Sequence, residues 1–168
     1  MKIPRNEDRS KHIRLIALDI RSSENVGSFF RTSDALGIEH VYLVGYTPTP
    51  LDMFNRPDSK IAKTALGAET SVPSSHHKTI GPLIKKLKKE GFTILALEQD
   101  PASLDYREDF SKKTSKIALI LGNEVTGVPK STLKTVDYIV EIPMRGTKES
   151  LNVSVAAGIA LSELTRLW

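Results

Sequence analysis

The chain has 168 residues, of which 24 are Lys or Arg, 20 are Asp or Glu and none is Cys. Its length favours one compact domain, and the missing Cys excludes disulfides, thiolate metal sites and cysteine nucleophiles and fits a cytoplasmic location. No apolar run approaches the ~20 residues of a membrane helix, and the N-terminus lacks the apolar segment of a secretory signal. The net charge of +4 is compatible with a polyanionic partner without establishing one.

Short aliphatic runs alternate with helical periodicity along the chain. In chain order, the expected elements are a strand over 13–20, a helix over 22–36 ended by Gly37, a strand over 40–44, a helix near 60–66, a brief strand over 70–72, a helix from Ile80, strands over 92–97 and 117–121, a short helix after Pro129, a strand over 138–142 and a helix over 151–167. This alternation predicts an α/β fold with a mostly parallel sheet and helices on both faces. Residues 1–11 are expected to form a basic N-terminal arm and residues 12–168 the single domain.

Ligands of such sheets bind beyond the carboxyl ends of the strands, so the segments that follow strands matter most. Three of them are polar: RSSENVGSFFRTSDALG at 21–37, LGNEVTGVPKS at 121–131 and PMRGTKESLNVSVAAGIALSEL at 143–164. Gly27 costs about 1 kcal/mol inside a helix, which indicates close approach of another backbone or a ligand. Ser150 is a candidate N-cap of the last helix, or else lies just before that helix. Each segment alone is equally consistent with an ordinary capped helix or connection.

Several common active-site motifs are absent from the sequence. It has no G-x-G-x-x-G fingerprint, no phosphate-binding Gly-Lys-Ser/Thr and no G-x-S-x-G elbow. The four histidines, His12, His40, His76 and His77, lack zinc spacing, so no metal site is expected. His76 and His77 are expected at the entry of a helix.

A basic helix near residues 80–89 carries Lys85, Lys86, Lys88 and Lys89 opposite an apolar stripe. This pattern is typical of a solvated face, and the alternative is contact with an RNA backbone. Further positive charge would come from the arm if it lies nearby: Lys2, Arg5, Arg9, Lys11 and Arg14. The sequence has little aromatic interleaving, so it does not indicate a stacking platform for single strands.

Taken together, the three polar segments resemble the three motifs of the SpoU/TrmH family of SPOUT RNA 2′-O-methyltransferases. The matching stretches are ENVGSFFRTSDALG, LILGNEVTGVP and IPMRGTKESLNVSVAAGIAL, and the resemblance spans about residues 13–166. It implies a C-terminal deep trefoil knot that holds S-adenosyl-L-methionine. The resemblance also implies the residues that bind this cofactor: Leu97, Glu98, Leu121, Gly122, Asn123, Ile142, Met144 and Leu151.

The resemblance further implies transfer of a methyl group to a ribose 2′-hydroxyl of RNA. Arg31 matches the family's catalytic arginine. Since arginine keeps its proton at neutral pH, we expect it to clamp a phosphate and polarise the attacking oxygen, and to act as a base only if it is desolvated in the complex. Lys85, Lys86 and Lys89 are expected to contact RNA together with Arg31. Asn25 would orient Arg31 or the ribose, and Glu124 would hold Arg31 or a polar neighbour. Ser150 would hydrogen-bond the ribose or a phosphate, and Asn152 would fix the loop of the third motif and the final helix.

Family members are homodimers, so Arg31 is expected to reach the cofactor bound by the partner, with Ser154, Ala157 and Gly158 in or near a close helix interface. The short form, with no separate N-terminal RNA-binding domain and no long C-terminal extension expected, suits a tRNA substrate or an rRNA recognised by the catalytic dimer alone, and we favour tRNA. Two other readings remain: a non-catalytic RNA-binding relative, and an unrelated flavodoxin-like nucleotide-binding domain.

Overall fold

A computed structural model describes residues 12–166. The elements along the chain are β1 (His12–Leu18), α1 (Ser23–Leu36), β2 (His40–Val44), α2 (Ser59–Ala65), α3 (Ala68–Ser71), β3 (Ser74–His77), α4 (Ile80–Lys89), β4 (Thr93–Leu97), β5 (Leu104–Asp105), β6 (Lys116–Leu121), α5 (Lys130–Leu133), β7 (Tyr138–Glu141) and α6 (Val153–Arg166). No helix in this part of the chain is long and apolar enough to cross a membrane.

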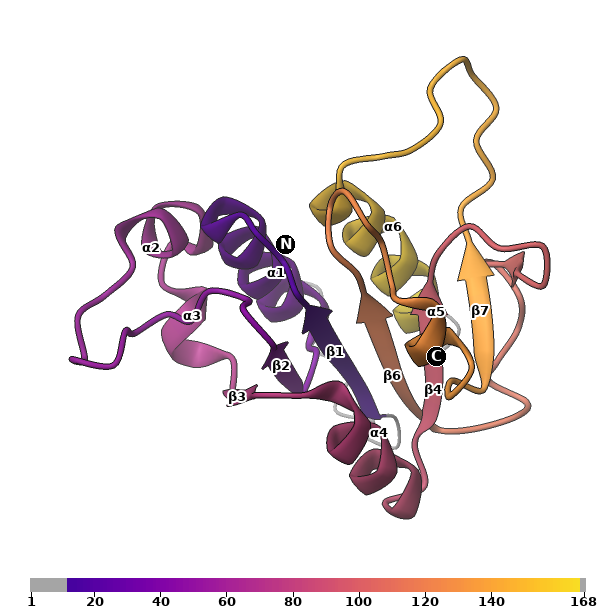
Figure 1. Ribbon diagram of the computed structural model, residues 1–168, viewed down its shortest axis with the longest axis horizontal. Helices are drawn as coiled ribbons and strands as arrows, with labels where there is room; N and C mark the ends of the chain where they lie inside the picture. The colour runs from indigo at the N-terminus through magenta and orange to yellow at the C-terminus, as the bar shows by residue number, and fades with distance from the viewer. Residues whose placement is uncertain (1–11, 167–168) are drawn as a thin grey trace, which may run out of the picture.

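Seven strands form one sheet in the order β3-β2-β1-β6-β4-β7-β5, and every neighbouring pair is parallel. Helices cover both faces of this sheet (Figure 1). The predicted α/β architecture with a parallel sheet is therefore confirmed. Because all strands point the same way, the loops that follow them gather at one edge, which Figure 1 shows at the top.

The sheet separates two hydrophobic cores. Leu15 and Ala17 of β1 face the core shared with α1, α2, α3 and α6, whereas Ile16 and Leu18 face the core shared with α4. Alternate residues of one strand point to opposite faces, and here both faces are buried. This explains why the central strands appear in the sequence as continuous aliphatic runs.

Local sequence signals set the ends of α1. The Ser22 side chain accepts a hydrogen bond from the Asn25 amide, and Gly37 ends the helix in the left-handed conformation at φ 69°. Gly27 lies in the first turns of this helix, where an added Cβ would lie 2.5 Å from the Ile61 carbonyl oxygen of α2. Of the two explanations for Gly27, close approach of another backbone is therefore the correct one.

The predictions were wrong on the segment before α4. The expected strand over 70–72 is absent, since Ala68–Ser71 form the short helix α3. The strand follows instead as β3, which pairs with β2 and contains His76 and His77, so these histidines do not lie at a helix entry. The two-residue strand β5 at the far edge was not expected. The proposed basic arm at 1–11 lies outside the described residues.

Candidate active site

A cavity of about 530 Å³ opens where β4, β6 and β7 end at the carboxyl edge of the sheet. It is lined by all eight residues that were expected to bind a cofactor: Leu97, Glu98, Leu121, Gly122, Asn123, Ile142, Met144 and Leu151. Glu124, Ser150 and Asn152 also line it. Three loops that are far apart in the sequence thus form one concave site, at the edge where ligands of parallel sheets bind.

The loop after β6 turns back tightly on itself at the cavity wall. An added Cβ at Gly122 would lie 2.5 Å from the Val128 amide nitrogen, so no larger residue fits there without moving the backbone. The buried Asn123 holds the turn, because its Oδ1 accepts hydrogen bonds from the amides of Val125 (2.8 Å) and Thr126 (2.9 Å). Its Nδ2 donates to the carbonyl of Asp19 at 2.9 Å. The turn is therefore fixed before any ligand arrives.

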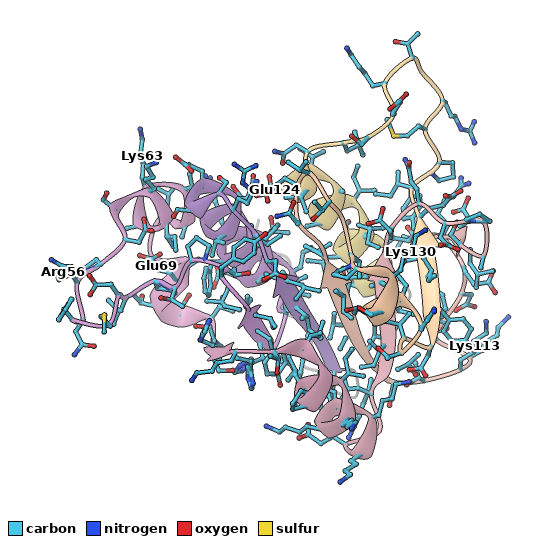
Figure 2. The ribbon with its side chains drawn as sticks, viewed as in Figure 1. Arg56, Lys63, Glu69, Lys113, Glu124 and Lys130 are labelled. Carbon is cyan, nitrogen blue, oxygen red and sulfur yellow. The ribbon has the colours of Figure 1, made fainter. Side chains whose placement is uncertain are left out.

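Three side chains of the predicted catalytic set are joined by hydrogen bonds. Asn25 Nδ2 donates to Glu124 Oε1 at 2.9 Å, and Asn152 Nδ2 donates to Asn25 Oδ1 at 3.3 Å. Figure 2 shows Glu124 between the N-terminal ends of α1 and α6. These contacts connect one residue from each of the three polar segments identified in the sequence.

Glu124 also accepts backbone hydrogen bonds from the start of α1. The amides of Arg21 (2.9 Å) and Ser22 (3.1 Å) both donate to its carboxylate. Partial burial alone would raise the pKa of Glu124, but these amide donors together with Asn25 outweigh it and lower the pKa below its ordinary value. Glu124 is therefore ionised at neutral pH and acts as an acceptor.

Glu98 connects two walls of the cavity. Its Oε2 accepts from the Val128 amide at 2.8 Å, and its Oε1 accepts from the Gln99 amide at 2.9 Å. Both carboxylate oxygens are thus engaged by backbone, so the side chain holds the end of β4 against the loop after β6.

Asn152, rather than Ser150, caps the last helix. Asn152 Oδ1 accepts from the amides of Ser154 (2.8 Å) and Val155 (3.3 Å), the pattern of an N-cap side chain. Of the two alternatives predicted for Ser150, the position just before the helix is confirmed and the role of N-cap is wrong. Ser150 lies two residues earlier in the chain and lines the cavity.

Arg31 and the predicted lysines do not line the cavity of this chain. Arg31 is exposed on α1, six residues and about 9 Å along the helix from Asn25. Lys85, Lys86 and Lys89 lie on α4 close to Glu90, which contacts the start of β1 through Arg14 Nη1 at 3.0 Å. These lysines are therefore at the opposite edge of the sheet from the cavity.

The sequence reasoning missed two polar contacts at the rim. The Tyr46 hydroxyl accepts from Asn123 Nδ2 at 2.6 Å, and Gln99 Nε2 donates to the Glu149 carbonyl at 2.6 Å. Both Tyr46 and Gln99 follow a strand by two residues, so the strand-end rule applied to every strand would have found them. In the part of the chain that the structure describes, no group of His, Asp or Glu is arranged to hold a metal ion.

This geometry defines a parallel α/β protein with a preformed ligand cavity made by three strand-end loops. Comparison with known proteins gives the family: residues 12–162 match the model of the SpoU rRNA methylase family. The chain belongs to this family.

Individual relatives agree with that assignment. The chain is 33% identical over 151 residues to the tRNA (guanosine(18)-2′-O)-methyltransferase of Escherichia coli K12, an alignment covering 88% of this chain and 60% of that protein. An AdoMet-bound rRNA methyltransferase from Sinorhizobium meliloti superposes with a TM-score of 0.82 at 27% identity over 92% of this chain and 56% of that one. A protein whose structure was solved in work on the 2-OH methylation of C/U34 on tRNA superposes with a TM-score of 0.78 at 26% identity. This superposition covers 94% of this chain and 97% of that one.

Proposed function

We propose that the chain is an RNA methyltransferase that transfers a methyl group from S-adenosyl-L-methionine to a ribose 2′-hydroxyl. The observation that carries this proposal is the cavity lined by the second and third family motifs, beside which Asn25 of the first motif is hydrogen-bonded to Glu124 and Asn152. The chain spans about 60% of the length of the Escherichia coli relative described above. The proposed activity is therefore argued from the geometry of the site.

The cavity fits the cofactor in size and in chemistry. Its volume lies within the usual range for small-molecule sites, and Leu97, Leu121, Ile142 and Leu151 give it apolar walls for a planar adenine. Because Gly122 has no side chain, the backbone of Gly127 and Val128 packs directly against it and shapes this wall of the cavity. When bound, S-adenosyl-L-methionine supplies a methyl group on a positively charged sulfur.

The protein residues would align and polarise the attacking hydroxyl. We assign the contact with RNA to Arg31, whose five fixed N–H donors suit bidentate binding of a phosphate. Glu124 and Asn25 hold the start of α1, the helix that carries Arg31, while Asn152 holds the start of α6. Ser150, on the cavity rim, would donate to the ribose or phosphate. Held geometry of this kind is worth several kcal/mol of the barrier.

We also propose that the active form is a homodimer. Arg31 lies outside the cavity of its own chain, and α1 and α6 contact each other along one face of the sheet. On α6, Val155 is 51% exposed, and an added Cβ at Gly158 would meet nothing within 4 Å of its own chain. A second copy packed on these helices would bury Val155 and fill the open space beside Gly158. The same packing would bring Arg31 to the partner's cavity.

Two finer features of the proposal come from the family. The first is the knot: β4 lies between β6 and β7 in the sheet, and after β7 the chain returns to place α6 beside α1. We propose that this path threads the C-terminal segment into the family's trefoil knot. The second is the substrate, which we propose to be tRNA, because the structure described by tRNA methylation covers nearly the same length as this chain.

The decisive experiment measures transfer of tritium from labelled S-adenosyl-L-methionine to tRNA and to rRNA by wild type and Arg31→Ala. We expect wild type to incorporate the label into tRNA, and 2′-O-methyl mapping to place the new methyl group on a ribose. The rate of incorporation should fall at least a hundred-fold with Arg31→Ala. Arg31→Lys retains the positive charge but loses the planar guanidinium that can bind a phosphate with two N–H groups at once. We therefore expect it to recover only a small part of the rate.

The matched control is Lys134→Ala, which removes an exposed cation near the amino ends of the strands. It should methylate at the wild-type rate. Equal labelling by wild type and Arg31→Ala would refute the role of Arg31. RNA binding with no transfer by wild type would refute the proposed reaction and favour the non-catalytic alternative.

A further inference from the structure

A second cavity, of about 680 Å³, shares no lining residue with the proposed cofactor site. It is enclosed by the loop at 48–57, by α2 and α3, and by the edge strand β3. Apolar walls come from Leu51, Met53 and Pro57, and polar groups from Glu69, Ser75 and His76. Mixed lining and this volume are typical of a site that binds a small planar group.

The carboxylate of Glu69 is incompletely satisfied. Its Oε2 is fully enclosed, and no atom within residues 12–166 donates a hydrogen bond to it. In Figure 2, Glu69 lies on the α3 side of the space enclosed by the loop. A buried acceptor without a donor is costly. Because Oε2 is closed off from solvent, a turn of the side chain into the cavity that Glu69 lines would bring this oxygen to an N–H group of a ligand and offset that cost.

The loop that closes the cavity displays apolar side chains to solvent. Met53 is 88% exposed and Phe54 is 67% exposed. The Arg56 guanidinium carbon lies 5.0 Å from the centre of the Phe54 ring, and Figure 2 shows Arg56 on the outer part of the loop. An exposed aromatic ring paired with arginine is the arrangement on which bases of single-stranded RNA stack.

Hydrogen bonds preform this loop. Asp52 accepts from the amides of Phe54 (2.8 Å) and Arg56 (3.0 Å) and from Arg56 Nε at 2.7 Å. The display of Phe54 is therefore built into the fold rather than left to a flexible segment. Large exposed apolar side chains on a fixed loop mark an interaction surface.

We propose that this cavity and its loop bind an unstacked base of the RNA substrate, with Phe54 stacking on a base and Glu69 accepting from an exocyclic amino group. This inference rests on the proposed function, because it takes RNA as the partner. The loop starts at the rim of the first cavity, where Tyr46 contacts Asn123. From Tyr46 to Thr49 the chain spans at most about 10 Å, so the two cavities are within reach of one RNA strand.

The carboxylate determines which bases fit. Adenine, cytosine and guanine carry an amino group that donates to a carboxylate oxygen, as cytosine does to acidic side chains in nucleic-acid complexes. Uracil offers only an imino N–H flanked by two carbonyl oxygens, and one of these would face the second carboxylate oxygen. The site should therefore disfavour uridine.

The test is a titration of the ¹⁵N-labelled full chain with pentanucleotides of adenosine, cytidine and uridine, followed by amide chemical shifts. We expect saturable shifts at 50–57 and 74–76 with the adenosine and cytidine oligomers and at least ten-fold weaker binding of the uridine oligomer. Glu69→Gln should weaken the adenosine and cytidine oligomers about ten-fold. Phe54→Ala should do the same, and Phe54→Tyr should stay within about two-fold of wild type.

Glu108→Gln, which neutralises an exposed carboxylate on the connection between β5 and β6, is the matched control and should bind like wild type. Equal affinity for all three oligomers, unaltered binding by Glu69→Gln, or tighter binding of spermidine at the same amides would overturn the proposal. The titration needs no S-adenosyl-L-methionine. Methyl transfer without these shifts would refute the base site alone, and the shifts without methyl transfer would refute the proposed reaction alone.

Discussion

Replacing Glu124 by Gln tests the hydrogen-bond network that joins the three motifs. Glu124 Oε1 accepts from the Ser22 amide and Asn25 Nδ2, and Oε2 accepts from the Arg21 amide. Whichever position the new amide nitrogen takes, it faces at least one N–H donor, so one hydrogen bond is lost and the others lose their charge. Hydrogen bonds to charged groups contribute about 1.5–3 kcal/mol, and because Glu124 is exposed we take the lower end, about 1.5 kcal/mol.

Thermal unfolding measures this loss. For a chain of this size, each kcal/mol shifts the Tm by about 2–4 °C, so Glu124→Gln should lower it by about 3–6 °C at pH 7. Adding Asn25→Ala to the variant should cost less than adding it to wild type, because the two side chains share one contact. Glu108→Gln provides a control carboxylate outside the network.

The same substitution predicts a pH dependence. Since the folded pKa of Glu124 is below its ordinary value of 4.5, its ionised form stabilises the protein above pH 4.5, and this contribution is lost as pH falls through the folded pKa. The difference in Tm between wild type and Glu124→Gln should therefore shrink below pH 4.5. A Tm within about 1 °C of wild type at pH 7, or a difference that grows in acid, would refute the reasoning.

Three further substitutions test individual contacts. Gly122→Ala would push the loop after β6 away from Val128, and calorimetry should find binding of S-adenosyl-L-methionine weakened at least ten-fold; unchanged affinity would contradict the tight turn. Asn152→Ala removes the cap of α6, so urea unfolding should show a loss of about 1 kcal/mol; Ser150→Ala, which removes no cap, should stay within about 0.3 kcal/mol. Gly27→Ala overpacks α1 against Ile61, and the same measurement should show a loss of about 1–3 kcal/mol; an unchanged urea midpoint would show that α1 and α2 separate freely.

Elements with strong local signals were predictable from the sequence. The ends of α1 follow from Ser22 and Gly37, because both caps act within a few residues. The strand β3 was not predictable in this way. Its sequence, Ser74–His77, has no aliphatic residue, and it extends the sheet by pairing along β2. Long-range pairing decides such an edge strand, and no local pattern reports it.

The candidate site was predictable to a similar degree. The strand-end rule and the family motifs identified eleven residues of the first cavity's lining, because most of them lie at the end of a strand or in the loop that follows it. Residue type alone could not choose between Ser150 and Asn152 as the cap of α6, since both types cap helices and lie two positions apart; only the family resemblance implied that Asn152 fixes this helix. No sequence pattern marked Glu69 as a site residue, because the cavity around it exists only after four separate segments have packed together.

The pairing of β1 with β6 has a consequence for synthesis of the chain. His12 lies opposite Lys116, so one side of β1 stays open until about 100 further residues have been made. At 5–20 residues per second, that interval is roughly 5–20 s on the ribosome. During it, an aliphatic strand with free amide and carbonyl groups is exposed to other nascent chains, which makes the half-made protein a natural client for chaperones.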